Sequence, residues 1–178
     1  MSISEIPLTL QSRQWERTGT WEEWPVLTCS ISLPEVCTPG QGARRINRYY
    51  RRVDAVLRRW LARRYHACCR RAQQALAASR PLPSECVLVT WEAAYQDARL
   101  LSLVWTLEAE GQRRQFADLW TWPDGLPADV RTLLPRDLLR QTRRRTLCLA
   151  EDGIWLLGAD SRRRLAPLPE HMPRAPSG

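Results

Sequence analysis

The stretch ARRINRYYRRVDAVLRRWLARRYHACCRRAQQALAA, residues 43–78, decides the fold of this chain because it contains neither glycine nor proline. Apolar residues recur within it at spacings of three and four, the signature of an amphipathic helix. The members of this apolar stripe are Ile46, Tyr50, Val53, Leu57, Trp60, Leu61 and Cys68. We therefore predict one long helix over residues 43–78, with a bend near Arg64, where the stripe is interrupted.

The opposite face of this predicted helix is strongly basic. Asp54 is the only acidic residue in residues 43–78, so the arginines lack the glutamates one turn away that usually accompany them on a solvated helix. This pattern indicates a surface for an anionic partner, such as nucleic acid, teichoic acid or phospholipid. The candidate binding residues are Arg44, Arg48, Arg51, Arg52, Arg59 and Arg63.

The composition supports a second interpretation of the same face. All 27 basic residues are arginine and lysine is absent, as codon bias in a GC-rich genome would produce. On that interpretation the net charge of +8 partly reflects the bias, and the arginines form only a solvated surface. The predicted helix has no Asn or Gln cluster among its arginines and no preceding helix-turn-helix spacing, so nothing indicates base readout.

Strands are predicted on both sides of the helix. Val26–Leu33 alternates apolar and polar residues, which is typical of a half-buried strand. Three further alternating segments follow the helix, over residues 87–95, 101–107 and 116–122. The last two are separated by a short turn at Glu110-Gly111, which predicts an antiparallel hairpin within a three-strand meander.

The remaining segments complete the predicted fold. Short helices are expected over Ala128–Leu133 and Pro135–Arg144, and a C-terminal hairpin over residues 146–150 and 154–158. The order is then strand, long helix, three-strand meander, short helices and C-terminal hairpin. This order predicts the α+β class, with the long helix packed on one face of an antiparallel sheet.

The length of 178 residues fits one domain. We predict an irregular arm over residues 1–24, a single α+β domain over residues 25–168 and a loose tail over residues 169–178. No apolar run approaches the roughly 20 residues of a transmembrane helix, and the N-terminus shows no signal-peptide pattern. With six cysteines and no CxxC pair, these features predict a cytoplasmic protein with reduced thiols and no transmembrane segment.

The element order and four short sequence pieces resemble a known family. The pieces are Ile46-Asn47, Leu101-Ser102-Leu103, Trp120–Pro127 with Gly125 at the turn, and Asp152-Gly153-Ile154. Over residues 25–165 the chain resembles the C-terminal domain of RsiV-type anti-sigma factors, a domain also found beside PdaC-type polysaccharide deacetylases. The resemblance implies the fold predicted above and a non-catalytic binding module.

The resemblance implies less about a particular partner. In RsiV-type proteins the domain lies outside the cell membrane and binds lysozyme, which controls the release of a sigma factor. This sequence shows no transmembrane helix and no sigma-binding segment, so membrane signalling is not implied for it. Its turn at Gly111 also lacks the Gly-Gly-Ala-His-like stretch common in the family, so lysozyme recognition is not implied either.

No convergent metal-binding or catalytic group is predicted. His66, Cys68 and Cys69 are close in sequence, but successive helical residues turn by about 100°, so the three side chains cannot meet at one metal. The only other histidine is His171, in the tail. With histidines so placed, no Ser-His-Asp or Cys-His arrangement is expected. We predict no metal and no cofactor.

The acidic residues offer no better case for an enzyme. Glu92 and Asp118 occupy strand positions and could face each other, but no helper residue accompanies them, while Asp124 and Asp152 precede turn glycines. We therefore predict a non-enzymatic binding or sensor domain with another protein as partner. The alternative is a binder of nucleic acid or another polyanion through the arginine face. The oligomeric state stays open.

Overall fold

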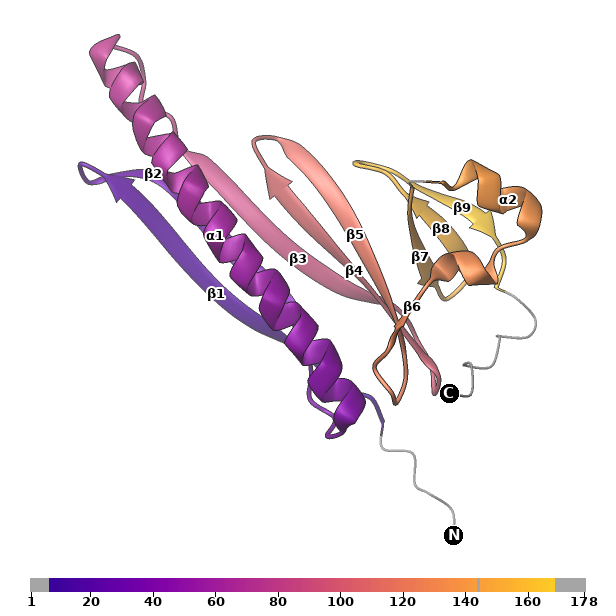
Figure 1. Ribbon diagram of the computed structural model, residues 1–178. Helices are drawn as coiled ribbons and strands as arrows, with labels where there is room; N and C mark the ends of the chain where they lie inside the picture. Colours follow the sequence, from indigo (N-terminus) through magenta and orange to yellow (C-terminus); the bar gives the residue numbers. More distant parts are fainter. Residues whose placement is uncertain (1–6, 144, 169–178) are drawn as a thin grey trace.

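The computed structural model describes residues 7–143 and 145–168. Its elements are β1 (Leu10–Trp21), β2 (Trp24–Val36), α1 (Gln41–Ala77), β3 (Glu85–Gln96), β4 (Leu100–Ala109), β5 (Gln112–Thr121), β6 (Pro127–Ala128), η1 (Val130–Leu133), α2 (Arg136–Gln141), β7 (Thr146–Ala150), β8 (Gly153–Leu157) and β9 (Arg162–Ala166). They form an α+β fold with a six-stranded and a three-stranded sheet (Figure 1). Within the described ranges, no helix combines the length and apolarity needed to cross a membrane.

The large sheet has the strand order β1-β2-β3-β4-β5-β6. The neighbours β2 and β3 are parallel, with Leu27 opposite Glu85 and Ile31 opposite Val89, and all other neighbours are antiparallel. Parallel neighbours need a long connection, and α1 provides it. The predicted three-strand meander is present as β3, β4 and β5, whereas the prediction of a wholly antiparallel sheet is wrong at the β2–β3 pair.

Helix α1 lies along one face of this sheet and closes the main core. The buried side chains of the predicted stripe are Ile46, Tyr50, Leu57, Leu61 and Cys68. Val53 and Trp60 are half-buried at the margin of the stripe and pack against the same core. The helix continues unbroken past Arg64, so the interruption of the stripe there has another cause, an ion-pair cluster described below.

The N-terminal segment differs from the prediction of an irregular arm over residues 1–24. β1 pairs with β2 along its whole length, from Leu10 opposite Val36 to Trp21 opposite Trp24. Trp15 and Trp21 pack at the edge of the core. β1 is an edge strand with polar residues on both faces, so its sequence carries little of the alternation by which strands are recognised. The predicted tail, residues 169–178, lies outside the described residues.

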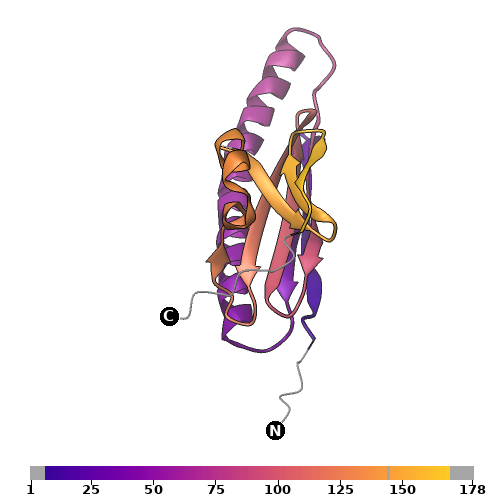
Figure 2. The same ribbon diagram turned by 90° about the vertical axis from the view of Figure 1, so that its right-hand side faces the viewer.

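The three-stranded sheet packs on the face of the large sheet that α1 leaves free (Figure 2). Val104 of β4 points to this face and packs with Cys148 and Leu157 of the small sheet, whereas its neighbours Leu103 and Trp105 face α1. β7 and β8 form the predicted C-terminal hairpin. The third strand, β9, falls in the arginine run that the sequence interpretation leaves outside any element.

A close backbone contact holds the beginning of α1 against the loop after β5. A Cβ atom at Gly42 would overlap the carbonyl oxygen of Pro123, and one at Gly125 would overlap the carbonyl oxygen of Gly42. Gly125 also has a φ of +63°, a conformation that glycine adopts without strain. Arg45 adds a hydrogen bond to the carbonyl oxygen of Asp124 at 3.0 Å. Both glycines are therefore required for this contact.

Candidate functional site

The six arginines predicted as a binding surface all lie on the solvent side of α1. At about 100° per residue they fall within an arc of about 120°, centred opposite the buried stripe. Each of their side chains is exposed. We call this set the arginine face: Arg44, Arg48, Arg51, Arg52, Arg59 and Arg63.

The arginine face carries charge that the described part of the chain does not balance. α1 contains eleven arginines and one acidic residue, Asp54. Arg58 pairs with Asp54 at 3.1 Å, and Arg64 and Arg71 pair with glutamates of the sheet. Within residues 7–143 and 145–168, no carboxylate lies within 4 Å of an arginine-face guanidinium. Arg70, exposed on the same arc, extends the face by two turns.

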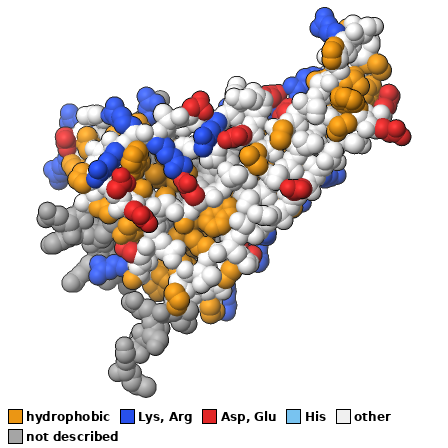
Figure 3. All heavy atoms as spheres, turned by 180° about the vertical axis from the view of Figure 1, so that it is seen from behind, with side chains coloured by type: hydrophobic (Ala, Val, Ile, Leu, Met, Phe, Trp, Pro, Cys, Tyr) orange, Lys and Arg blue, Asp and Glu red, His pale blue; other side chains and the backbone are white. Residues whose placement is uncertain are grey.

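The far side of the molecule has a different charge pattern. Figure 3 shows the view from behind, in which arginines over the small sheet are interspersed with carboxylates. In the same part of the molecule, Arg162 of β9 forms an ion pair with Glu92 of β3 at 2.5 Å. Charges of both signs at short range largely cancel in their effect on a distant partner. The side seen in Figure 3 therefore lacks the uninterrupted positive charge of the arginine face.

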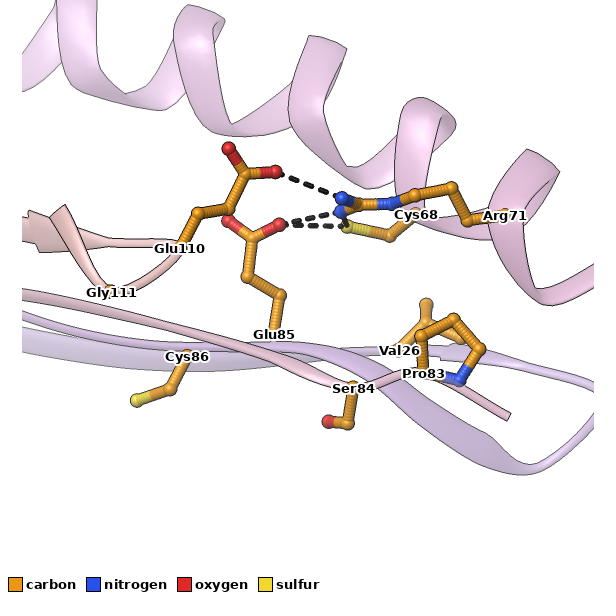
Figure 4. Close-up of a pocket in the computed structure, with 9 residues that line it drawn as sticks. All are labelled: Val26, Cys68, Arg71, Pro83, Ser84, Glu85, Cys86, Glu110 and Gly111. Carbon is orange, nitrogen blue, oxygen red and sulfur yellow. Dashed lines mark hydrogen bonds and ion pairs between the residues drawn. The ribbon is translucent and has the colours of Figure 1, made fainter. Parts of the chain in front are cut away.

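An ion-pair cluster pins the second half of α1 to the sheet. The guanidinium of Arg71 lies 2.6 Å from Glu85 and 2.8 Å from Glu110, which project toward it from β3 and from the β4–β5 turn (Figure 4). Arg64 contacts the same two glutamates. Contacts from the guanidiniums of Arg64 and Arg71 hold the pKa of Glu110 below its usual range. The apolar stripe is interrupted at these two arginines because their guanidiniums bind glutamates on the sheet side.

The cysteine and histidine of this region do not converge. Cys68 is buried beneath Arg71, whose Nη2 lies 3.1 Å from its sulfur, and burial raises the pKa of the thiol. His66 is exposed on the other side of the helix. No group of three metal-binding side chains occurs in the described ranges, and the six cysteines are free thiols. His171 lies outside those ranges.

The two carboxylates considered for catalysis point to opposite faces of the large sheet. Asp118 of β5 faces α1, where it accepts hydrogen bonds from Tyr49 at 2.9 Å, Tyr50 at 2.8 Å and the indole of Trp105 at 3.2 Å. Burial raises the pKa of Asp118. Glu92 faces the small sheet, where it meets Arg162. Glu92 and Asp118 therefore cannot act on one substrate.

The Asp118 cluster is a site that sequence reasoning did not find. The tyrosine donors on α1 are 68 and 69 positions from Asp118, and the tryptophan donor on β4 is 13 positions from it. No local sequence spacing therefore predicts the cluster. The tyrosine rings also meet the indole of Trp120 edge-on, at centroid distances of 5.1 and 6.4 Å. With every carboxylate oxygen bonded inside the core, the cluster joins α1 to the sheet.

Comparison with known proteins places no further constraint on the site. A scan against protein-family models found no match for this chain, and a search of the curated proteins found none either. The resemblance to the RsiV-type domain therefore stays a prediction.

Proposed function

We propose that this protein is a non-enzymatic binding protein that holds an extended anionic partner against the arginine face of α1. The observation that carries the proposal is the contrast within one helix. Arg58, Arg64 and Arg71 are engaged by carboxylates, whereas the six arginines of the face have none within reach among the described residues. Exposed guanidiniums that no carboxylate of the described residues engages are available to phosphate, sulfate or carboxylate groups of a partner.

The geometry suits a long partner better than a small one. Arg44 and Arg63 are 19 positions apart, which corresponds to about 28 Å along the helix axis. A small anion would meet only one or two of these side chains at a time. A polyanion with regularly spaced charges would meet most of them, and its counterions would be released on binding.

Salt dependence is the test of this proposal. Binding of a fluorescein-labelled DNA duplex and of heparin is measured by anisotropy and competition over a range of NaCl concentrations. We expect log K to fall linearly with log [NaCl], by about 0.9 for each phosphate contacted. Reversing Arg48, Arg52 and Arg59 to Glu should remove the contribution of about three phosphate contacts from that slope. It should also abolish binding at physiological salt.

A matched control separates the arginine face from the net charge. Arg99, Arg136 and Arg140 are exposed and lie outside α1, so reversing them to Glu changes the charge by the same amount. The control should lose only a minor part of the affinity. Equal losses in both triple variants would contradict the proposed face. Binding to a protein partner that persists in high salt and survives the α1 reversals would instead favour the predicted protein-binding sensor role.

A further inference from the structure

A groove lies between β1 and the middle of α1, separate from the arginine face. Its volume is about 540 Å³, within the range of sites that take small organic ligands. Its floor is apolar and comes from both the sheet and the helix. Leu27 and Cys29 of β2 and Leu61 of α1 are buried there, each at most 6% exposed.

Each end of the groove is closed by an aromatic side chain held in place by its own contacts. At one end, the indole of Trp15 donates to Asp54 at 2.8 Å, and the guanidinium of Arg58 stacks over its ring at 4.1 Å. At the other end, Tyr65 donates to the carbonyl oxygen of Thr20 at 2.7 Å. These fixed end walls make the groove a preformed slot.

Two small residues shape the slot. A Cβ atom at Gly19 would lie 2.6 Å from Cδ2 of Tyr65, so only glycine allows the tyrosine ring to approach β1 this closely. Ala62 lines the slot between Arg58 and Tyr65, where a larger side chain would fill it. The seven positions from Arg58 to Tyr65 correspond to about 10 Å along the helix, which sets the length of the space.

The charge around the slot is positive. Arg17 of β1 and Arg58 of α1 both line it. Asp54 pairs with Arg58 at 3.1 Å, whereas no carboxylate of the described residues lies within 4 Å of the Arg17 guanidinium. Burial raises the pKa of the Cys29 thiol on the floor, and the nearby guanidiniums of Arg17 and Arg58 act in the opposite direction. A ligand in the slot would therefore meet an apolar floor beside an unbalanced cation.

We propose that this slot binds a small amphiphilic acid, with an apolar body about 10 Å long on Leu27, Cys29 and Leu61 and its anionic group at Arg17. The apolar body gains from leaving water, and the anionic group gains a charge-assisted hydrogen bond. A neutral amphiphile of equal length lacks the second contribution, and a cationic one is repelled. This site does not depend on the polyanion proposal, because none of its residues belongs to the arginine face.

The experiment uses the full chain and anilinonaphthalene sulfonate, which combines an apolar body with an anionic group, as the fluorescent probe. We expect saturable fluorescence enhancement that decanoate reverses, with decanol and decylamine requiring at least about tenfold higher concentrations. Ala62→Trp should fill the slot and weaken the probe at least about tenfold. Arg17→Gln should weaken decanoate about three- to tenfold and leave decanol unchanged.

Two control variants keep the result interpretable. Ala77→Trp places the same ring on an exposed position at the end of α1, outside the slot and beyond the arginine face, and Arg99→Gln removes an arginine elsewhere. Both should bind the probe like the unmodified protein, and thermal melts followed by circular dichroism confirm that all four variants fold. The proposal is overturned if the folded Ala62→Trp variant binds the probe normally, or if decanoate and decanol compete equally well.

Discussion

Replacing Tyr50 by Phe removes a single hydroxyl group from the core and tests the role of the Asp118 cluster. The Tyr50 hydroxyl lies 2.8 Å from Oδ2 of Asp118, and its side chain is only 1% exposed, so water cannot take its place. A hydrogen bond to a charged group contributes about 1.5–3 kcal/mol net to stability. We therefore expect the free energy of unfolding, measured by urea denaturation, to fall by about 1.5–3 kcal/mol.

The loss should depend on pH because the acceptor titrates. Burial raises the pKa of Asp118, while the hydrogen bonds from Tyr50, Tyr49 and Trp105 act against that rise. A carboxyl whose folded-state pKa lies above its unfolded-state value weakens the fold once it ionises. Removing one donor raises the folded-state pKa further. The cost of Tyr50→Phe is thus full above that pKa and shrinks as the pH falls through it.

Tyr49→Phe is the matched control for this prediction. Tyr49 donates to the other oxygen of the same carboxylate at 2.9 Å, but its side chain is only half-buried, so water can replace its hydroxyl. Its loss should be about 0.5–1.5 kcal/mol. Both variants are unfolded in urea at about pH 7.5 and about pH 4.5. Equal losses for the two tyrosines, or a Tyr50→Phe loss that does not change with pH, would refute this reasoning.

Two further substitutions test the contacts that position α1. Gly42→Ala forces a methyl group onto the carbonyl oxygen of Pro123 and should cost roughly 1–3 kcal/mol. Gln41→Ala, at the exposed preceding position, serves as its control in thermal melts, and equal melting temperatures would contradict the close contact. Glu110→Gln should lower the melting temperature at neutral pH, because a carboxyl with a depressed folded-state pKa stabilises the fold above its unfolded-state pKa. That difference should disappear as the pH falls through the depressed pKa, whereas Glu108→Gln, in a surface pair with Arg113, should have a smaller effect at every pH.

The elements that depend on local periodicity could be predicted from the sequence. The helix over residues 43–78 corresponds closely to α1, because a long segment without glycine or proline and with a 3.6-residue period has few alternatives. The same periodicity placed the arginine face opposite the core. The meander β3-β4-β5 followed from alternation and from the Glu110-Gly111 turn, at which both residues have a positive φ.

The features that depend on distant pairing could not be predicted. β1 gave a weak signal because its polar residues fall on both faces of an edge strand, and β9 was hidden in a run of three arginines. The parallel pairing of β2 with β3 is a property of how α1 crosses the sheet. The partners of Asp118, Arg64 and Arg71 come from other elements, so these clusters became visible only in three dimensions.

The parallel β2–β3 pairing has a consequence for the order in which the chain folds. Glu85 follows its partner Leu27 by 58 positions, whereas the hairpins β1–β2 and β4–β5 close through tight turns. Closing so long a loop costs about 2 kcal/mol more chain entropy than closing a turn of a few residues. The helix is about 55 Å long and packs against strands on both sides of the β2–β3 pair. This packing offsets the entropic cost, because it holds the two hairpins side by side. The seam between β2 and β3 is thus the high-contact-order part of the fold, and it depends on α1 being formed.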